Sequence, residues 1–197
     1  MVQWDGCQSL CNLSYDSAEN QHKIAQAGGL SLIVQAMHEH SQNPKVQASG
    51  CLALANLSHD YHDNDPMITI EGGIGATRNA MMAHKKDKDV QNHACMVFRN
   101  ISFFSPENRS LIPLVGGIPL ILAAMNGNVR HSEIQAHGIG ALANLALNTQ
   151  NKEAIVKKGG IGAIRSAKNF HKNDAEVQKC CRVALSRLGA GAMRKMS

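Results

Sequence analysis

The sequence predicts an all-α solenoid, a stack of similar helical units, because three sequence markers recur with one period. Glycine pairs begin at Gly28, Gly72, Gly116 and Gly159, with spacings of 44, 44 and 43 residues. A Val-Gln or Ile-Gln pair recurs in phase, beginning at Val2, Val46, Val90, Ile134 and Val177. An asparagine followed by Leu or Ile recurs at Asn12, Asn56, Asn100 and Asn144. Repeats of this length are typical of supersecondary units that stack to bury a continuous core.

Each unit is predicted to contain three helices. In the short first helix, Ser105 followed by Pro106 supplies an N-cap and a proline at the first helical position. The glycine pair then separates the first helix from the second, because glycine adopts the left-handed conformation and permits close packing. The second helix, as in residues 30–37, stops at a polar turn such as residues 40–44. The third helix runs roughly from Val46 to Ser58 and measures about 20 Å.

The units are predicted to begin near Ser17, Tyr61, Ser105 and Thr149. The resulting division is a third helix of a truncated unit at 1–16, four units at 17–60, 61–104, 105–148 and 149–188, and a flexible tail at 189–197. The first part lacks the two preceding helices of its unit, and neither end carries the polar capping unit that solenoids need for solubility. We therefore expect a piece of a longer array, or ends that a partner covers.

Composition narrows the classes of partner. The 20 basic and 15 acidic side chains give a net charge of +5 spread along the chain, a weak leaning toward acidic segments and not the footprint of a nucleic-acid binder. No apolar run approaches the length of a membrane span, so no membrane association is predicted. The 6 cysteines include no CxxC pair and read as small buried hydrophobes in a reducing compartment, the cytoplasm and also the nucleus.

A unit with three helices, a glycine pair after the first and an Asn-Leu or Asn-Ile near the end of the third resembles the armadillo repeat. The segments GGIPL at 116–120 and GCLALANL at 50–57 carry the resemblance most closely. The resemblance covers essentially the whole chain and implies a right-handed α-solenoid. It also implies a non-catalytic scaffold that holds an extended peptide in its concave groove, as β-catenin and importin-α do. HEAT repeats, the nearest rival, have two helices per unit and no recurrent helix-terminal asparagine.

The third helix can be divided into faces at about 100° per residue. Val46, Leu54 and Leu57 form one apolar stripe that must face the core. Asn56 lies off this stripe, beside the residues four and seven positions before it. The resemblance assigns this face to the concave groove.

Residues at equivalent positions on this face, compared from unit to unit, are the candidates for peptide binding. They are the asparagines Asn12, Asn56, Asn100 and Asn144, then Gln8, Leu52 and Met96 four residues earlier, Ser49, His93 and His137 seven residues earlier, and Arg99 and Phe104 beside Asn100. A carboxamide carries both a donor and an acceptor, so it can pair with the N–H and C=O of an extended backbone, and its neighbours would supply specificity. The chain lacks the tryptophans that importin-α carries four residues before its asparagines, which argues against nuclear-import cargo.

Two alternatives stay open at these positions. The asparagines could instead bond a nearby carbonyl and lock one unit to the next. Phe103 and Phe104 could form a binding hot spot with Met96 and Arg99, or plug the junction with the following unit.

No metal, cofactor or catalytic centre is predicted. Equivalent histidines such as His93 and His137 recur one unit apart, about 8–10 Å, whereas two ligands of one zinc ion need nitrogens within about 4 Å. Gly73 and Gly75 open a helix without the preceding strand that a dinucleotide fingerprint requires. No nucleophile, base and acid recur at a useful spacing, so the chain is predicted not to be an enzyme.

Two other functions are compatible with the sequence. The chain could be an interior structural segment of a larger scaffold or signalling protein, its groove empty or filled by its own chain or by self-association through uncapped ends. Nucleic-acid binding along the basic turns is less favoured, because the lysines there alternate with acids and read as a solvated surface. They are Lys85, Lys86, Lys88, Lys168 and Lys172.

Overall fold

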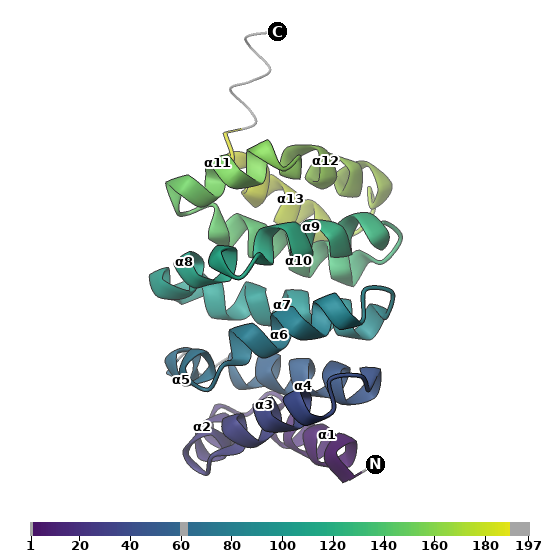
Figure 1. Ribbon diagram of the computed structural model, residues 1–197. Helices are drawn as coiled ribbons and strands as arrows, with labels where there is room; N and C mark the ends of the chain where they lie inside the picture. Colours follow the sequence, from purple (N-terminus) through teal and green to yellow (C-terminus); the bar gives the residue numbers. More distant parts are fainter. Residues whose placement is uncertain (1, 60–62, 190–197) are drawn as a thin grey trace, which may run out of the picture.

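The computed structural model describes residues 2–59 and 63–189, which form 13 α-helices and no strand. The helices are α1 (Val2–Ser14), α2 (Ala18–Gln26), α3 (Gly29–Glu39), α4 (Pro44–Leu57), α5 (Asn64–Ile70), α6 (Gly73–Ala83), α7 (Lys88–Phe104), α8 (Pro106–Leu114), α9 (Gly117–Gly127), α10 (Ser132–Leu145), α11 (Thr149–Lys157), α12 (Gly160–Phe170) and α13 (Ala175–Arg187). They stack in chain order from one terminus to the other (Figure 1). The predicted all-α solenoid is confirmed.

The helices form two layers. The third helices of successive units, α1, α4, α7, α10 and α13, pack against one another, and each shorter pair, such as α8 and α9, covers the same side of them (Figure 1). A predicted unit boundary near Tyr61 and the predicted tail beyond Gly189 lie outside the described residues. The side of the third-helix layer that carries the asparagines is called here the third-helix face.

The N-cap predicted at Ser105 is present. The Ser105 hydroxyl accepts a hydrogen bond from the backbone N–H of Asn108 at 3.1 Å, and Pro106 begins α8. The Asn148 side chain caps α11 in the same way, accepting from the N–H of Asn151 at 3.1 Å. These side chains satisfy N–H groups that have no partner within the helix.

Each glycine of a pair meets a different requirement. Gly116 precedes α9 with φ +80°, in the left-handed region that other residues adopt only with strain. A Cβ on Gly117 would lie 2.4 Å from Cγ2 of Ile112, so the second glycine lets α8 and α9 approach closely. The other pairs repeat both features, which explains their period.

The glutamine of the recurrent Val-Gln or Ile-Gln pair has a role that the sequence alone did not reveal. Nε2 of Gln91 donates to the carbonyls of Met81 and His84, at 3.0 and 3.1 Å, where α6 ends. Gln47, Gln135 and Gln178 repeat this pattern. The last carbonyls of a helix lack intrahelical donors, so this glutamine satisfies carbonyls at the C-terminal end of the second helix in each unit.

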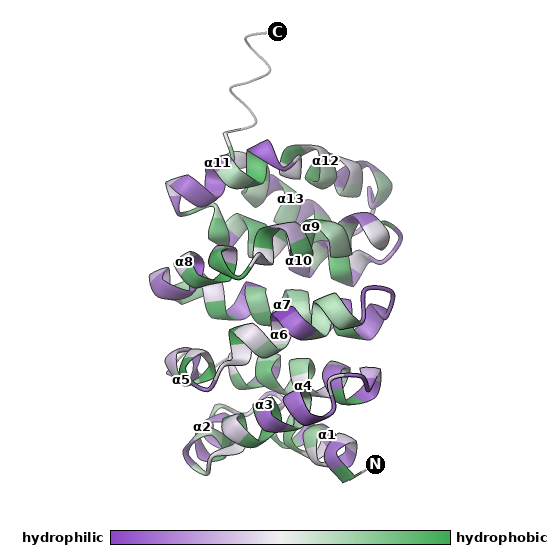
Figure 2. Ribbon diagram, in the orientation of Figure 1, coloured by the Kyte–Doolittle hydropathy of each residue, from purple (hydrophilic) through white to green (hydrophobic). Residues whose placement is uncertain are grey.

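The core follows the predicted apolar stripe. Val46, Leu54 and Leu57 are all buried, as the helical-face assignment required. Hydrophobic residues occur in every unit, whereas the turns between second and third helices are mostly hydrophilic (Figure 2). Within the described chain no individual helix is both long and apolar enough to cross a bilayer; α8 and α9, bent by 75°, meet that criterion only when taken together, by length and composition.

Candidate functional site

The recurrent asparagines join the third helices to one another. In each case the side-chain Nδ2 donates to the backbone carbonyl of the residue that precedes the equivalent asparagine of the previous unit. The bonds run from Asn56 to Cys11, Asn100 to Ala55 and Asn144 to Arg99, at N–O distances of 3.1, 3.0 and 2.9 Å. We call these three residues the asparagine ladder.

The ladder has a structural role. The accepting carbonyls of Cys11 and Ala55 lie in the last turns of α1 and α4, and that of Arg99 lies in the turn before the last of α7. The bonds therefore lock each unit to the next. This is one of the two roles that sequence analysis left open. Asn56 and Asn144 are 5% exposed, Asn100 is half-buried and Asn12 is exposed.

The amide oxygens show what the ladder has left for a ligand. Among the described residues no donor reaches Oδ1 of Asn56 or Asn100, whereas Oδ1 of Asn144 accepts from Nη1 of Arg187 at 3.2 Å. Peptide recognition by the ladder therefore stays a prediction. It would use the Oδ1 atoms of Asn56 and Asn100 as hydrogen-bond acceptors.

Two adjoining hollows lie on the third-helix face. The larger, about 510 Å³, is lined by Ser58, His59, Met96, Arg99, Asn100, Phe103, Phe104, His137 and Glu176. The smaller, about 220 Å³, shares His59 and Met96 with it and extends to Tyr15, Asp16, Gln21 and Asn56. We call the larger one the Arg99 hollow. Five predicted site residues therefore meet at one place: Met96, Arg99, Asn100, Phe104 and His137.

The other predicted residues do not line the Arg99 hollow. Nearer the N-terminus, the Ser49 hydroxyl donates to Oε1 of Gln8 at 3.2 Å, and Nε2 of Gln8 donates to Oδ1 of Asn12 at 3.3 Å. His93 Nδ1 donates to the carbonyl of Ala48 at 3.0 Å, another bond between neighbouring units. Leu52 is half-buried against the core, and Asn144 lies outside both hollows.

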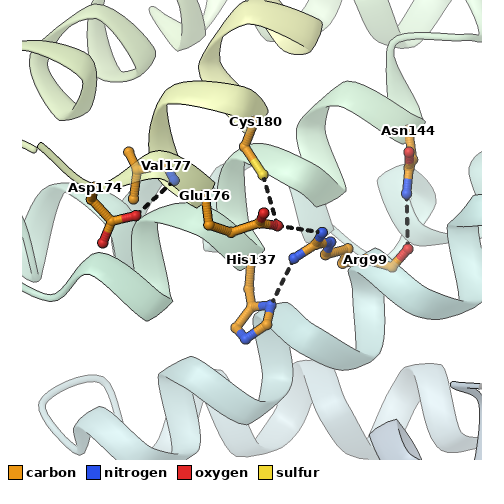
Figure 3. Close-up of polar contacts among 7 residues, drawn as sticks. All are labelled: Arg99, His137, Asn144, Asp174, Glu176, Val177 and Cys180. Atoms are coloured by element: carbon orange, nitrogen blue, oxygen red, sulfur yellow. Dashed lines mark hydrogen bonds and ion pairs between the residues drawn. The ribbon is translucent and has the colours of Figure 1, made fainter. Parts of the chain in front are cut away.

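A chain of polar contacts crosses the Arg99 hollow (Figure 3). Nη2 of Arg99 on α7 donates to Oε1 of Glu176 on α13 at 3.0 Å, and Nη1 donates to Nδ1 of His137 on α10 at 3.3 Å. The contacts thus join three successive third helices. The Arg99 side chain is 31% exposed and that of Glu176 47%.

Two members of this set of contacts, Arg99 and Glu176, are held by features of the backbone. The carbonyl of Arg99 is the one that Asn144 of the ladder bonds, so the ladder anchors the residue that projects into the hollow (Figure 3). Glu176 lies in the first turn of α13, where the Asp174 side chain accepts from the N–H of Val177 at 3.0 Å. That cap fixes the start of α13.

Gly140 makes the long reach of Arg99 sterically feasible. A Cβ at Gly140 would lie 2.8 Å from both Cδ and Nε of Arg99. The equivalent position in the other units carries a larger side chain, as at Met96 and Val183. Sequence analysis missed the roles of Gly140 and Glu176; the available signal was a glycine standing alone in a column of larger residues.

Burial and charge set the protonation state of the cluster. Burial, followed by the Arg99 charge and then by His93, lowers the pKa of His137 to about 4, so its ring is neutral at pH 7. Its Nδ1 can then accept from the guanidinium. The hydrogen bond from Arg99 lowers the pKa of Glu176, which keeps that carboxylate ionised.

Phe103 and Phe104 form an exposed aromatic wall. Their rings meet edge-on with centroids 4.5 Å apart, and the two side chains are 52% and 57% exposed. Both side chains line the Arg99 hollow, so they are available to contact a ligand there.

The cysteines are buried, as expected of small hydrophobic residues. All 6 are free and buried, and burial raises the pKa of Cys51 and Cys95 to about 12. Within the part of the chain that the structure describes, no group of three or more His, Cys, Asp or Glu side chains could hold a metal ion.

Comparison with known proteins identifies the fold. No protein-family model and no curated protein matches the chain. An engineered protein solved by the Northeast Structural Genomics Consortium matches with a TM-score of 0.81 and 28% identity, over 95% of this chain and 44% of that one. The armadillo repeats only protein of Plasmodium falciparum matches with a TM-score of 0.74 and 18% identity, over 92% of this chain and 78% of that one.

Two further matches come from structures concerned with binding. A chain from a structure of the cadherin and β-catenin interaction matches with a TM-score of 0.74 and 23% identity, over 91% of this chain and 32% of that one. A designed armadillo repeat protein in complex with the peptide (KR)4 matches with a TM-score of 0.60 and 16% identity, over 92% and 91%. This chain thus spans less than half of the engineered protein and about a third of the β-catenin-related chain.

Proposed function

We propose that this chain, which has the armadillo repeat fold of these solved structures, is a non-catalytic scaffold that binds an extended segment of a partner protein along the third-helix face. The observation that carries the proposal is the pair of adjoining hollows beside Asn56 and Asn100. A designed protein of this fold is solved with a bound peptide, and a natural one in the context of cadherin, which supports this type of ligand.

The dimensions of the face suit an extended chain. Stacked helices lie about 8–10 Å apart and an extended peptide advances about 3.3 Å per residue, so each unit would meet two or three ligand residues. The Oδ1 atoms of Asn56 and Asn100 can accept backbone N–H groups. Met96 and the aromatic wall of Phe103 and Phe104 offer apolar contact, and Arg99 offers charge.

The state of the cysteines and of His137 favours binding over catalysis. The six thiols are buried, and burial raises the pKa of Cys51 and Cys95 far above neutrality, which disfavours nucleophilic chemistry. His137 uses its Nδ1 to accept from Arg99. The free thiols also support a reducing location, the cytoplasm and by extension the nucleus.

The proposal can be tested with a displayed library of random 12-residue peptides selected against the immobilised chain. Enriched peptides are synthesised with a fluorescent label and their affinity is measured by anisotropy for the wild type and two variants. Phe103→Glu places a charge in the Arg99 hollow, whereas Leu114→Glu makes the same kind of change at an 81% exposed site on α8. We expect at least about a tenfold loss for Phe103→Glu and less than about twofold for Leu114→Glu.

Circular dichroism and light scattering on the same samples control for folding and self-association. Failure of any peptide to enrich, or equal losses in both variants, would contradict binding at this face. Replacing the asparagine ladder by alanine is a poorer test, since it also removes bonds between units.

A further inference from the structure

Arg99 is an exception among the residues that precede the recurrent asparagines. The other asparagines follow a small side chain, at Cys11, Ala55 and Ala143, and Ser186 precedes Arg187, which takes the place of the asparagine in the last unit. Only the third of these helices, α7, therefore places a long cationic side chain at this position, and it projects into the Arg99 hollow. Gly140 leaves the space through which it extends.

Glu176 meets Arg99 as a ligand carboxylate would. One oxygen, Oε1, accepts from Nη2 at 3.0 Å, and this carboxylate comes from a helix two units further along the chain. A guanidinium can hold a carboxylate through two parallel hydrogen bonds, whereas Arg99 spends Nη1 on His137. The observed contact is thus a partial version of the strongest pairing that Arg99 can make.

Replacing Glu176 by a ligand carboxylate would cost little folding free energy. Ion pairs between partly exposed side chains contribute little to folding stability, and both of these side chains are open to solvent. Lys179 lies close enough to Glu176 for its charge to lower the pKa of that carboxyl, so a released Glu176 keeps a nearby cation.

We propose that Arg99 is a specificity-determining residue that binds an Asp or Glu side chain of the partner segment, and that Glu176 occupies this place when no ligand is bound. The inference rests on the proposed peptide-binding function and names the chemistry of its ligand. Adjacent to Arg99, Met96 and Phe103 form the apolar part of the hollow, so the preferred segment places a bulky apolar residue next to its acid.

The first experiment compares two selections from the random 12-residue library, one on the wild type and one on Arg99→Glu. We expect acidic residues beside apolar ones to be enriched on the wild type and basic residues to be enriched on the charge-reversed variant. Enriched pools with the same charge preference on both proteins would overturn this inference and leave the proposed binding function intact. Absence of enrichment on both proteins would overturn this inference and the proposed binding function together.

The second experiment measures the role of Glu176 with one wild-type-selected peptide and its Glu→Gln counterpart. Glu176→Gln removes the competing carboxylate, so we expect about threefold to fivefold tighter binding of the acidic peptide and no change for the neutral one. Glu133→Gln is the matched control, because Glu133 is an exposed carboxylate of α10 that contacts Asn92 outside the hollow. Equal gains in both variants would show a general charge effect, and no gain in either would show that Glu176 does not compete; both results overturn the inference.

Discussion

The two halves of the third-helix face share the asparagine ladder and differ in what surrounds it. In the N-terminal half, Gln8 bonds both Ser49 and Asn12, so neutral polar groups satisfy one another. In the C-terminal half, Arg99 extends over Gly140 to reach Glu176, and the surface opens into a hollow of about 510 Å³. The ladder is therefore the constant frame, and the columns beside it make one region chemically distinct.

The distinct region arises from two departures that meet in adjacent units. A long side chain at Arg99 alone would collide with a β-carbon at position 140 on the neighbouring helix, and a glycine at Gly140 alone would weaken α10. Together they place a cation across the face of α10. A periodic stack can thus acquire a local site without changing its period.

The largest expected effect is a difference in unfolding free energy between valine substitutions at two glycines of α10. A Cβ on Gly138 would lie 2.7 Å from Cγ of the buried Met125, so Gly138→Val should overpack the core and cost about 2–3 kcal/mol of unfolding free energy. Gly140→Val meets only the movable Arg99 side chain and should cost less than about 1 kcal/mol. Urea denaturation followed by circular dichroism measures both. Similar costs would mean that Arg99 is held as firmly as the core.

A smaller effect compares rungs of the ladder. Asn144→Ala removes a donor to the Arg99 carbonyl and an acceptor for Arg187, and should cost about 2 kcal/mol. Asn56→Ala removes its donor to the Cys11 carbonyl and should cost about 1 kcal/mol. Urea midpoints give the ranking, and Asn12→Ala at an exposed position serves as the control. A larger cost for Asn56→Ala would reverse the comparison.

The pH dependence of stability sharpens the contrast through His137. Its pKa in the folded state is about 4 and in the unfolded state about 6.5, so between these values the unfolded chain binds more protons. Stability should therefore fall as pH drops below about 6.5, by about 2 kcal/mol at pH 5, and His137→Asn should remove that part of the loss. Parallel urea titrations at pH 7 and pH 5 measure the difference. An identical pH response in wild type and variant would contradict the burial of a neutral ring.

The smallest expected effect concerns the ion pair. Glu176→Gln should change the free energy of unfolding by less than about 0.5 kcal/mol, because its partners are partly exposed. A loss above about 1.5 kcal/mol would make the pair a structural fastening, and its exchange for a ligand carboxylate would then be costly.

Much of the candidate site follows from helical geometry in the sequence. The face assignment set Asn56 off the apolar stripe, and five of the predicted residues, Met96, Arg99, Asn100, Phe104 and His137, do meet at one hollow. What it could not supply is the partner of each polar group. The ladder bonds link residues 45 positions apart, and the pair of Arg99 and Glu176 links residues 77 positions apart.

Local chemistry determined the repeat itself. The left-handed conformation at position 116 favours glycine, and the Ser105 side chain satisfies a backbone N–H in the first turn of α8. Such local roles can be recognised from the sequence alone. Only the tertiary structure decided that the amides donate to the previous unit and that Arg99 crosses Gly140. The physical reason is that such contacts depend on the distance and rotation between packed units, which the whole core sets together.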